Sequence, residues 1–247
     1  MADKILELKN VGKIYNDTFY IRNVSFLIKA KEIISLLGPS GCGKTTILKL
    51  IGGITNYEEG EVKFYNNNFK MGYVPQHTSL LPNRTVFGNI SLVLEINKNS
   101  NKKTHNEKIF SILEKVGMTK YKDFLPHQLS GGMKQKVALA RALVLNPKIL
   151  LMDEPFSAID EITRWNYNFD LIDLLHKENI SVLFVTHNIE EAVLLSDQIF
   201  LISTKKPTHI YKKIKIIFKN QRNRELLLSK EYLKKLSQIR KTIEINY

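Results

Sequence analysis

The sequence contains little cysteine and no long apolar run. Its single cysteine, Cys42, excludes an internal disulfide, so stability has to come from burial and hydrogen bonding. No Cys/His cluster of the kind that holds structural zinc is present. No stretch approaches the roughly 18 uncharged apolar residues of a membrane helix. The beginning of the chain, Met1 to Lys4, lacks the basic and apolar regions of a signal peptide, and we therefore expect a cytosolic protein.

Acidic residues are scarce in one part of the chain only. The 247 residues carry a net charge of +13, with 43% hydrophobic and 25% charged residues, as in a soluble protein with a hydrophobic core. Residues 205–247 hold 13 of the 37 Lys and Arg residues but only 3 of the 24 Asp and Glu residues. Because the excess lies in this tail, we expect no nucleic-acid partner. The tail either reflects an AT-rich genome or favours an anionic membrane surface, where each basic residue contributes about 1 kcal/mol.

Short apolar runs separated by turn residues predict strands early in the chain. They span Ile5–Leu8, Ile21–Ile28 and Ile33–Leu37, and a glycine-rich loop follows the last of them directly. The residues from Thr45 to Ile51 suit a helix that leaves this loop and ends at Gly52-Gly53. This order of strand, loop and helix is typical of a phosphate-binding loop.

Helical and strand patterns alternate in the rest of the chain. Apolar residues recur at helical spacing from about Val86 to Val144, which predicts a helical insertion. The later runs Ile149–Met152 and Ser181–Val185 are short and largely apolar, like buried parallel strands, and a helix is predicted between them from about Thr163 to Lys177. A packed terminal helix is predicted from Arg224 to Ile239, with an amphipathic helix on a membrane surface as the alternative, from the spacing of Leu226, Ser229, Leu233, Leu236 and Ile239.

The glycine-rich loop satisfies the phosphate-loop pattern in its residues Gly38-Pro39-Ser40-Gly41-Cys42-Gly43-Lys44-Thr45. Its glycines allow successive backbone N–H groups to turn toward phosphate oxygens, and the positive end of the following helix adds to their field. Lys44 can reach the β- and γ-phosphates, and the Thr45 hydroxyl can bind Mg²⁺. We expect Cys42 to have thiolate character and to react with maleimide unless MgATP covers it, because a helix N-terminus and Lys44 are adjacent.

Two carboxylates follow a predicted buried strand, in the run Ile149-Leu150-Leu151-Met152-Asp153-Glu154. This is the edge at which α/β folds bind nucleotides. We expect Asp153 to hold Mg²⁺, usually through water. Glu154, one residue further along, is the candidate general base that polarises the attacking water.

The run Leu129-Ser130-Gly131-Gly132-Met133-Lys134-Gln135 resembles the signature motif of ATP-binding cassette proteins. Ser130 and the amides of the two glycines precede a predicted helix from Met133 to Leu143, which makes a second anion site. Four further segments look like other motifs of this family and occur in the family's order. Tyr15 resembles the aromatic residue that stacks on adenine, and Gln76 resembles the glutamine of the Q-loop. Ser157-Ala158-Ile159-Asp160 resembles the D-loop, and His187 resembles the switch histidine.

This resemblance implies an α/β fold. It consists of a phosphate-loop NTPase core, which is a RecA-like mixed sheet with flanking helices, together with an antiparallel β subdomain and an inserted α-helical subdomain. We expect a single domain over residues 1–247. Residues 1–85 and 145–204 would form the nucleotide-binding core, 86–144 the helical signature subdomain and 205–247 a basic C-terminal extension.

The resemblance also implies the site residues and the cofactors, ATP and Mg²⁺. The expected catalytic residues are Glu154, His187 and Gln76, and the expected metal ligands are Thr45, Gln76 and Asp153. The residues expected to bind the nucleotide are Tyr15, Gly38, Pro39, Ser40, Gly41, Cys42, Gly43, Lys44, Thr45, Thr46, Ser130, Gly131, Gly132 and Asp160. In this family each ATP lies between the phosphate loop of one chain and the signature motif of a second, so a head-to-tail dimer of two copies has two sites.

Further motifs look like the nitrate/sulfonate/taurine branch of importer cassettes, namely residues 38–46, 152–160 and 185–197. This implies an ATP-hydrolysing subunit that drives solute import through a separate permease, on the cytoplasmic face of the inner membrane, with an extracytoplasmic solute-binding protein. The alternatives are a cassette of a lipid or lipoprotein export complex and, less favoured, a soluble non-transport ATPase. The segment from His77 to Asn89 is expected to contact the permease. Departures from the family pattern include Thr208, where the branch tends to have glycine.

Overall fold

The computed structural model describes residues 3–66, 70–96, 102–157, 159–219 and 222–246. The strands are β1 (Lys4–Tyr15), β2 (Thr18–Lys29), β3 (Ile33–Leu37), β4 (Glu59–Phe64), β5 (Met71–Val74), β6 (Ile149–Asp153), β7 (Ser181–Thr186), β8 (Gln198–Ile202) and β9 (Ile210–Lys215). The α-helices are α1 (Lys44–Ile51), α2 (Val86–Ile96), α3 (Lys102–Lys115), α4 (Gly131–Leu143), α5 (Glu161–Glu178), α6 (Ile189–Leu195) and α7 (Lys230–Asn246).

A six-stranded sheet in the order β5-β6-β7-β3-β8-β9 lies at the centre of the fold. All neighbouring pairs are parallel except β8 and β9. Every residue of β3, β6 and β7 is buried. Strands that are covered on both faces need apolar residues throughout, which explains why the sequence shows continuous apolar runs there.

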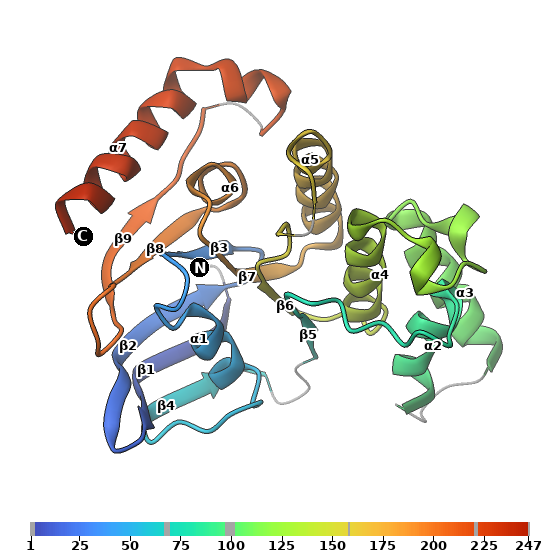
Figure 1. Cartoon of the computed structure of the whole chain (residues 1–247), viewed down its shortest axis with the longest axis horizontal. Helices are drawn as coiled ribbons and strands as arrows, with labels where there is room; N and C mark the ends of the chain where they lie inside the picture. The colour runs from blue at the N-terminus through green and yellow to red at the C-terminus, as the bar shows by residue number, and fades with distance from the viewer. Residues whose placement is uncertain (1–2, 67–69, 97–101, 158, 220–221, 247) are drawn as a thin grey trace.

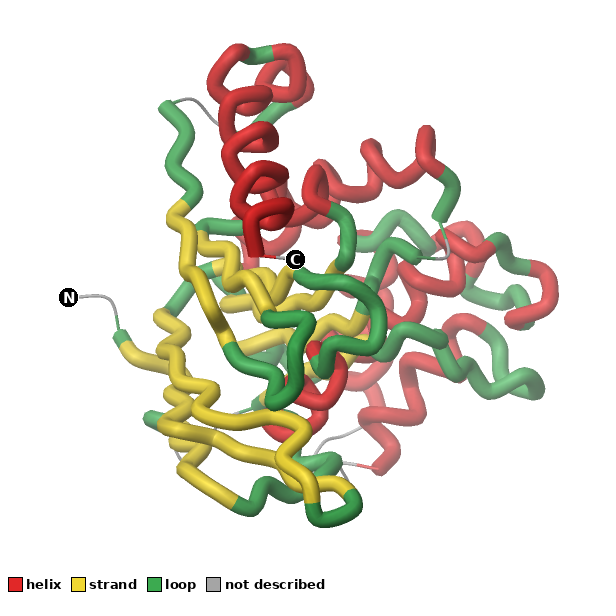
Figure 2. The backbone as a smooth tube through the Cα atoms, turned by 60° about the vertical axis from the view of Figure 1, so that its left-hand side comes forward, coloured by secondary structure: helices red, strands yellow, loops and turns green. Residues whose placement is uncertain are grey.

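Alternate residues of these strands enter two different cores. Ile34 and Leu151 point to the face covered by α1 and by the antiparallel sheet β2-β1-β4, so that α1 lies between the two sheets (Figure 1). Leu150 and Phe184 point to the other face, where they pack with the helices. This alternation is the two-residue period of a strand. Figure 2 shows the resulting separation of strands on one side and most helices on the other.

The inserted helices α2, α3 and α4 lie beyond β5 at one end of the sheet (Figure 1). The helical insertion predicted from the sequence is therefore present. α4 begins at Gly131, two residues earlier than predicted, because the Ser130 hydroxyl accepts a hydrogen bond from the backbone N–H of Met133 at 3.3 Å and caps the helix there. The α/β fold class, with a mixed sheet, an antiparallel β sheet and added helices, is confirmed.

The basic tail packs against the rest of the fold. β9 joins the central sheet, a 3-10 helix spans Arg224–Leu228, and α7 lies on α6. The predicted terminal helix is thus present but begins at Lys230, and its buried stripe includes Tyr232, Leu236 and Ile239. The prediction that Leu233 belongs to this stripe is wrong, because Leu233 is 54% exposed.

The packing of α7 argues against the alternative prediction, an amphipathic helix on a membrane surface. Its apolar stripe is buried inside the fold, and the hydroxyl of Tyr232 donates to the carbonyl of Glu190 in α6 at 3.2 Å. Within the described residues, no helix has both the length and the apolar character needed to cross a bilayer.

Candidate active site

The carboxyl ends of β3, β6 and β7 meet at one edge of the central sheet. The registers pair Leu37 with Thr186 and Asp153 with Val185, so the residues that follow each strand leave the sheet side by side. These residues are Gly38, Glu154 and His187, all of which the sequence singled out. In a parallel sheet this edge is where ligands bind.

The phosphate loop turns tightly between β3 and α1. Gly41 and Gly43 have φ angles of 78° and 101°, in the left-handed region that favours glycine. A Cβ atom at Gly43 would also lie 3.2 Å from the Thr208 hydroxyl, so a larger residue would be crowded as well as strained. The eight-residue helix α1 begins directly after this turn, at Lys44, and its N-terminal amides face the same edge of the sheet.

Lys44 is buried at the centre of the loop, with 4% of its surface exposed. Its ammonium donates to the carbonyls of Gly38 at 2.8 Å and Pro39 at 2.7 Å. A buried cation requires such partners. The loop therefore concentrates positive charge and helix amides in one place, which is the chemistry that binds a polyphosphate.

Thr45 and Asp153 form a pair of oxygen ligands beside the loop. The Thr45 hydroxyl donates to the Asp153 carboxylate at 2.8 Å. Burial raises the pKa of Asp153, while the hydrogen bond from Thr45 opposes that rise. Burial, followed by the charge of Asp153, raises the pKa of Tyr73 to about 12. A bound cation would stabilise the charged form of this buried carboxylate. Hydroxyl and carboxylate oxygens are the ligands that a hard divalent cation such as Mg²⁺ prefers.

Glu154 brings together the other expected catalytic residues. Its carboxylate accepts a hydrogen bond from the Gln76 side chain at 3.3 Å and lies 3.4 Å from Nδ1 of His187. Gln76 follows β5 and His187 follows β7, so the group is assembled from three strand ends. The backbone of Glu154 has φ 44°, a strained conformation for a residue other than glycine. Such strain is often found at functional sites.

The aromatic side of the site is an open cavity of about 680 Å³ near Tyr15. Tyr15 is 46% exposed and meets Tyr20 edge to face, with ring centroids 5.6 Å apart. Thr46 and Lys206 also line this cavity, and the Lys206 ammonium lies 4.3 Å from the centre of the Tyr20 ring. Tyr15 and Thr46 were predicted from the sequence, whereas Tyr20 and Lys206 were not. Lys206 comes from the connection between β8 and β9, which is distant in the sequence.

The same connection supports the phosphate loop from behind. The Thr208 hydroxyl donates to the carbonyl of Cys42 at 2.7 Å, and its backbone N–H donates to the carbonyl of Tyr20 at 2.8 Å. The Tyr20 hydroxyl in turn donates to the carbonyl of Gly41 at 2.8 Å. In the sequence, Thr208 is only a departure from a family pattern. In the fold it is a buried support of the loop.

The expectation that Cys42 has thiolate character is wrong. The residue is buried, with 6% of its surface exposed, and burial raises the pKa of its thiol. The Lys44 ammonium lies 3.8 Å from the sulfur and opposes that rise, but its effect is smaller than that of burial. The thiol points into the protein, while the backbone of the loop faces the site edge.

The signature residues lie apart from the phosphate loop. Ser130, Gly131 and Gly132 are at the start of α4, which packs beside β5, whereas α1 packs on β6 and β7 (Figure 1). Asp160 caps α5 by accepting from the backbone N–H of Thr163 at 2.9 Å. A nucleotide on the phosphate loop would thus use only part of the expected set in this chain. Ala158, within the expected D-loop, lies outside the described residues.

The sheet edge, the loop and the paired carboxylates define a phosphate-loop nucleotide-binding protein. Residues 21–157, more than half of the chain, match the family model described as ABC transporter. The chain therefore belongs to the ATP-binding cassette transporter family, and it is an ATP hydrolase whose activity is coupled to transport.

Several known proteins resemble this chain. An uncharacterized ABC transporter ATP-binding protein of Methanocaldococcus jannaschii is 38% identical over 245 residues, which cover 96% of this chain and 91% of that protein. A spermidine/putrescine import ATP-binding protein of Lawsonia intracellularis is 41% identical over 208 residues, covering 81% of this chain but only 56% of that protein. A solved dimeric ATP-binding cassette in a post-hydrolysis state, bound to ADP and Pi, has TM-score 0.76 at 30% identity, covering 87% of this chain and 100% of that chain.

Proposed function

We propose that this chain is the ATPase subunit of an importer, in which it binds MgATP, pairs with a second copy and drives a separate membrane permease. The observation that carries the proposal is the Glu154 carboxylate, held between Gln76 and His187 at the edge where the phosphate loop begins. Import is supported by similarity to import ATP-binding proteins, among them one for Fe(3+) ions in Haemophilus influenzae. Sequence motifs favour the nitrate/sulfonate/taurine branch within the importers.

The phosphate loop holds the triphosphate in this proposal. Its backbone amides and Lys44 bind the β- and γ-phosphates, Thr46 lines the side toward Tyr15, and Tyr15 stacks on adenine. Thr45 and Asp153 would hold Mg²⁺ together with Gln76. When bound, the ion would neutralise phosphate charge.

Glu154 acts as the general base. It takes a proton from water as the water oxygen bonds to the γ-phosphorus, and the bond from that phosphorus to the oxygen of ADP breaks. His187 and Gln76 orient the water and the carboxylate. Glu154 follows a fully buried strand, and the contacts of its carboxylate with Gln76 and His187 restrain the base.

A second copy completes each site. Ser130, Gly131 and Gly132 form a helix N-terminus that is partly exposed and separate from this chain's own phosphate loop. In a head-to-tail dimer the signature residues and Asp160 of one copy would cover the ATP on the other, which gives two equivalent sites. The nucleotide would then join the two copies.

The permease contact is proposed on the segment from His77 to Asn89. Leu81 is 39% exposed there, and its backbone N–H donates to the Asn89 side chain at 2.8 Å, so an apolar residue is presented on a fixed loop. This contact would hold the chain at the cytoplasmic face of the membrane, beside a permease that receives solute from an extracytoplasmic binding protein.

The chain acts in this proposal as one domain. Residues 1–85 and 145–204 form its core, residues 86–144 form the helical part, and residues 205–247 form the C-terminal extension.

Uptake measurements in the native cell test the direction of transport. The labelled solutes are nitrate, taurine, an alkanesulfonate and spermidine, and we expect deletion of the gene to abolish the uptake of one of them. Wild-type protein should restore this uptake, whereas E154Q protein should not. Unchanged uptake of every solute, together with lipid or lipoprotein retained in the inner membrane, would instead assign the chain to an export complex. Unchanged uptake with ordinary membranes and active purified ATPase would point to a non-transport role.

A further inference from the structure

A second pocket lies at the opposite end of the central sheet from the phosphate loop. It has a volume of about 720 Å³ and is lined in part by Glu32, Asp197 and Gln198. Glu32 and Asp197 directly precede β3 and β8, which run parallel, whereas the phosphate loop follows β3 at its other end. The pocket therefore shares no lining residue with the ATP site.

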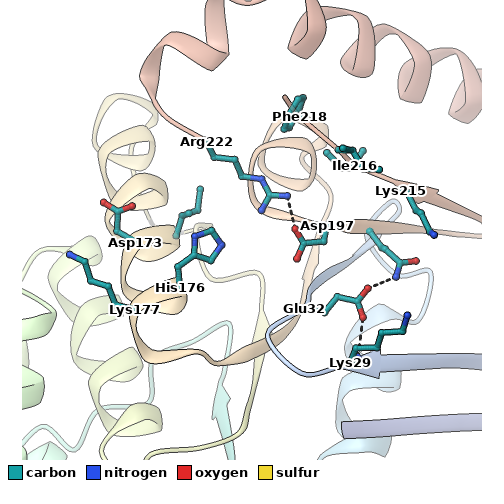
Figure 3. Close-up of a pocket in the computed structure, with 13 residues that line it drawn as sticks. Lys29, Glu32, Asp173, His176, Lys177, Asp197, Lys215, Ile216, Phe218 and Arg222 are labelled. Atoms are coloured by element: carbon teal, nitrogen blue, oxygen red, sulfur yellow. Dashed lines mark hydrogen bonds and ion pairs between the residues drawn. The ribbon is translucent and has the colours of Figure 1, made fainter. Parts of the chain in front are cut away.

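One wall of this pocket is the chain that follows β9. Arg222 fastens that chain to the fold, because its guanidinium donates to the carbonyls of Leu195 at 3.0 Å and Ser196 at 2.7 Å and to the carboxylate of Asp197 at 2.8 Å. Ile216 and Phe218 line the pocket from this wall. The facing wall is α5, which contributes Ile172 and His176 (Figure 3).

The carboxylates at the sheet end of the pocket are already engaged. Glu32 accepts hydrogen bonds from the backbone N–H of Lys29 at 3.0 Å and from the side chain of Gln198. Asp197 accepts from the backbone N–H of Ile33 at 2.9 Å as well as from Arg222. The Arg222 guanidinium neutralises Asp197, whereas both donors to Glu32 are uncharged, so Glu32 keeps its negative charge.

The lysines of the pocket are not matched in this way. Lys29 and Lys215 are exposed and lie on the same side of the pocket (Figure 3), and neither forms an ion pair with any described residue. Lys177 lies on the other side of the pocket, on the same helix as Asp173 (Figure 3), and it too forms no ion pair with a described residue. Lys29 and Lys215 therefore place two positive charges against the single carboxylate of Glu32, beside the apolar side chains of Ile217 and Phe218.

We propose that this pocket binds a small organic anion with an apolar body. Its carboxylate, sulfonate or phosphate group would lie on Lys29 and Lys215, and its body would cover the exposed Ile217 and the half-buried Phe218. The volume is in the range of pockets that hold small molecules. An inorganic anion would leave the apolar wall unused, and an organic cation would be repelled by the two ammonium groups. The site is separate from ATP and would add a ligand to those of the family.

A series of three probes with one body tests the charge preference. The probes are 3-phenylpropionate, 3-phenylpropanol and 3-phenylpropylamine. Each is titrated into the full chain labelled at isoleucine methyl groups, and binding is followed by the NMR signals of these methyl groups. Saturating MgATP covers the phosphate loop. We expect the propionate to shift the methyl signals of Ile172, Ile216 and Ile217 to saturation. The alcohol should bind about tenfold more weakly, the loss expected for one charge-assisted contact, and the amine should not bind.

Substitutions at the two lysines test the position of the anion. Lys29→Ala and Lys215→Ala should each weaken 3-phenylpropionate by about tenfold. Lys212→Ala is the matched control, because Lys212 is exposed on the same strand and does not line the pocket. Equal binding of all three probes, no saturable shift up to about 10 mM propionate, inorganic phosphate binding as tightly as the propionate, or equal losses with Lys212→Ala would each overturn the proposal.

Discussion

The guanidinium of Arg164 lies 3.5 Å from the carboxylate of Glu191 and also donates to the carbonyl of Ile159 at 2.8 Å. Glu191 is buried and also accepts a hydrogen bond from the Thr186 hydroxyl at 2.6 Å. Arg164 thus joins the residue before Asp160 to the helix after His187. Within one chain, this network therefore joins the segment proposed to act on the chain's own ATP, at His187, to the segment proposed to cover the ATP of the other copy, at Asp160.

Replacing Arg164 with alanine should destabilise the fold by about 2–4 kcal/mol, since Glu191 would keep its buried carboxylate without a cation. Burial already raises the pKa of Glu191, and Arg164 opposes that rise, so its removal raises the pKa further. A carboxyl with a raised pKa in the folded state favours folding while protonated and loses that advantage as pH rises through the folded pKa. The loss should therefore be larger at pH 8 than at pH 5.

Urea unfolding of R164A and wild type at the two pH values measures this difference. The double variant R164A/E191Q is the control, because an uncharged amide has no need of the guanidinium, and its stability should vary less with pH than that of R164A. An R164A loss that is the same at both pH values would show that Glu191 does not carry the effect.

Replacing Glu154 with glutamine should lower ATP hydrolysis by roughly 10²–10⁴-fold, the usual contribution of a positioned base. ATP affinity should be retained, because Lys44 and the loop amides are unchanged, and a dimer with two ATP molecules should accumulate in size-exclusion chromatography. H187A should resemble E154Q, whereas K44A should weaken ATP binding and leave the chain monomeric. Glu107→Gln, an exposed carboxylate on α3, is the matched control. E154Q that releases phosphate at nearly the wild-type rate would remove Glu154 from the role of base.

Cys42 should react slowly with N-ethylmaleimide at pH 7, because its thiol is buried and its pKa is raised. Raising the pH increases the thiolate fraction, so the rate should increase toward pH 9. Mass spectrometry of the intact chain reports the reaction directly, as Cys42 is the only cysteine. Labelling at pH 7 as fast as that of free glutathione would show that the thiol is exposed.

Replacing Thr208 with valine should weaken MgATP binding about fivefold, on the order of 1 kcal/mol, because the carbonyl of Cys42 loses its 2.7 Å hydrogen bond and the loop loses a support. Isothermal titration calorimetry measures the affinity. Thr204→Val changes an exposed threonine of the same connection and should have no effect. Equal affinities for the two variants would restrict Thr208 to a role in packing.

Replacing Leu81 with aspartate should abolish transport while the isolated chain still binds ATP, because a charge would enter the proposed permease contact. Phe87→Asp should behave alike but also cost stability, since Phe87 packs on Phe110 with ring centroids 5.6 Å apart. ATP binding and solute uptake are measured in parallel. Normal transport by a folded L81D/F87D protein would contradict the proposed contact.

Local patterns predicted much of the site. The phosphate loop is set by glycines next to Lys44, and Asp153 and Glu154 follow a strand whose burial requires apolar residues, so short segments determine both. Gln76 and His187 were found by their order along the chain, and the parallel register then brings them to Glu154.

Contacts between distant segments could not be predicted. Lys206 reaches the cavity near Tyr15, and Thr208 reaches the phosphate loop, because β8 and β9 pair, and no neighbouring residue in the sequence indicates these contacts. The thiolate expectation for Cys42 failed because it weighed adjacent charge without the burial that only the fold reveals. In α7 the spacing of leucines predicted a stripe through Leu233, whereas contact with α6 selects the face of Tyr232 and Ile239.

The packing of α7 on α6 affects how the protein should be handled. α6 begins two residues after His187, and Tyr232 holds its first turn through the carbonyl of Glu190. A bulky fusion at the C-terminus, or a deletion that removes α7, would change the contacts that hold α6, the helix after His187. Altered ATP turnover in such a protein would show that the C-terminal tail influences His187. An affinity tag used for kinetic work therefore belongs at the other end of the chain.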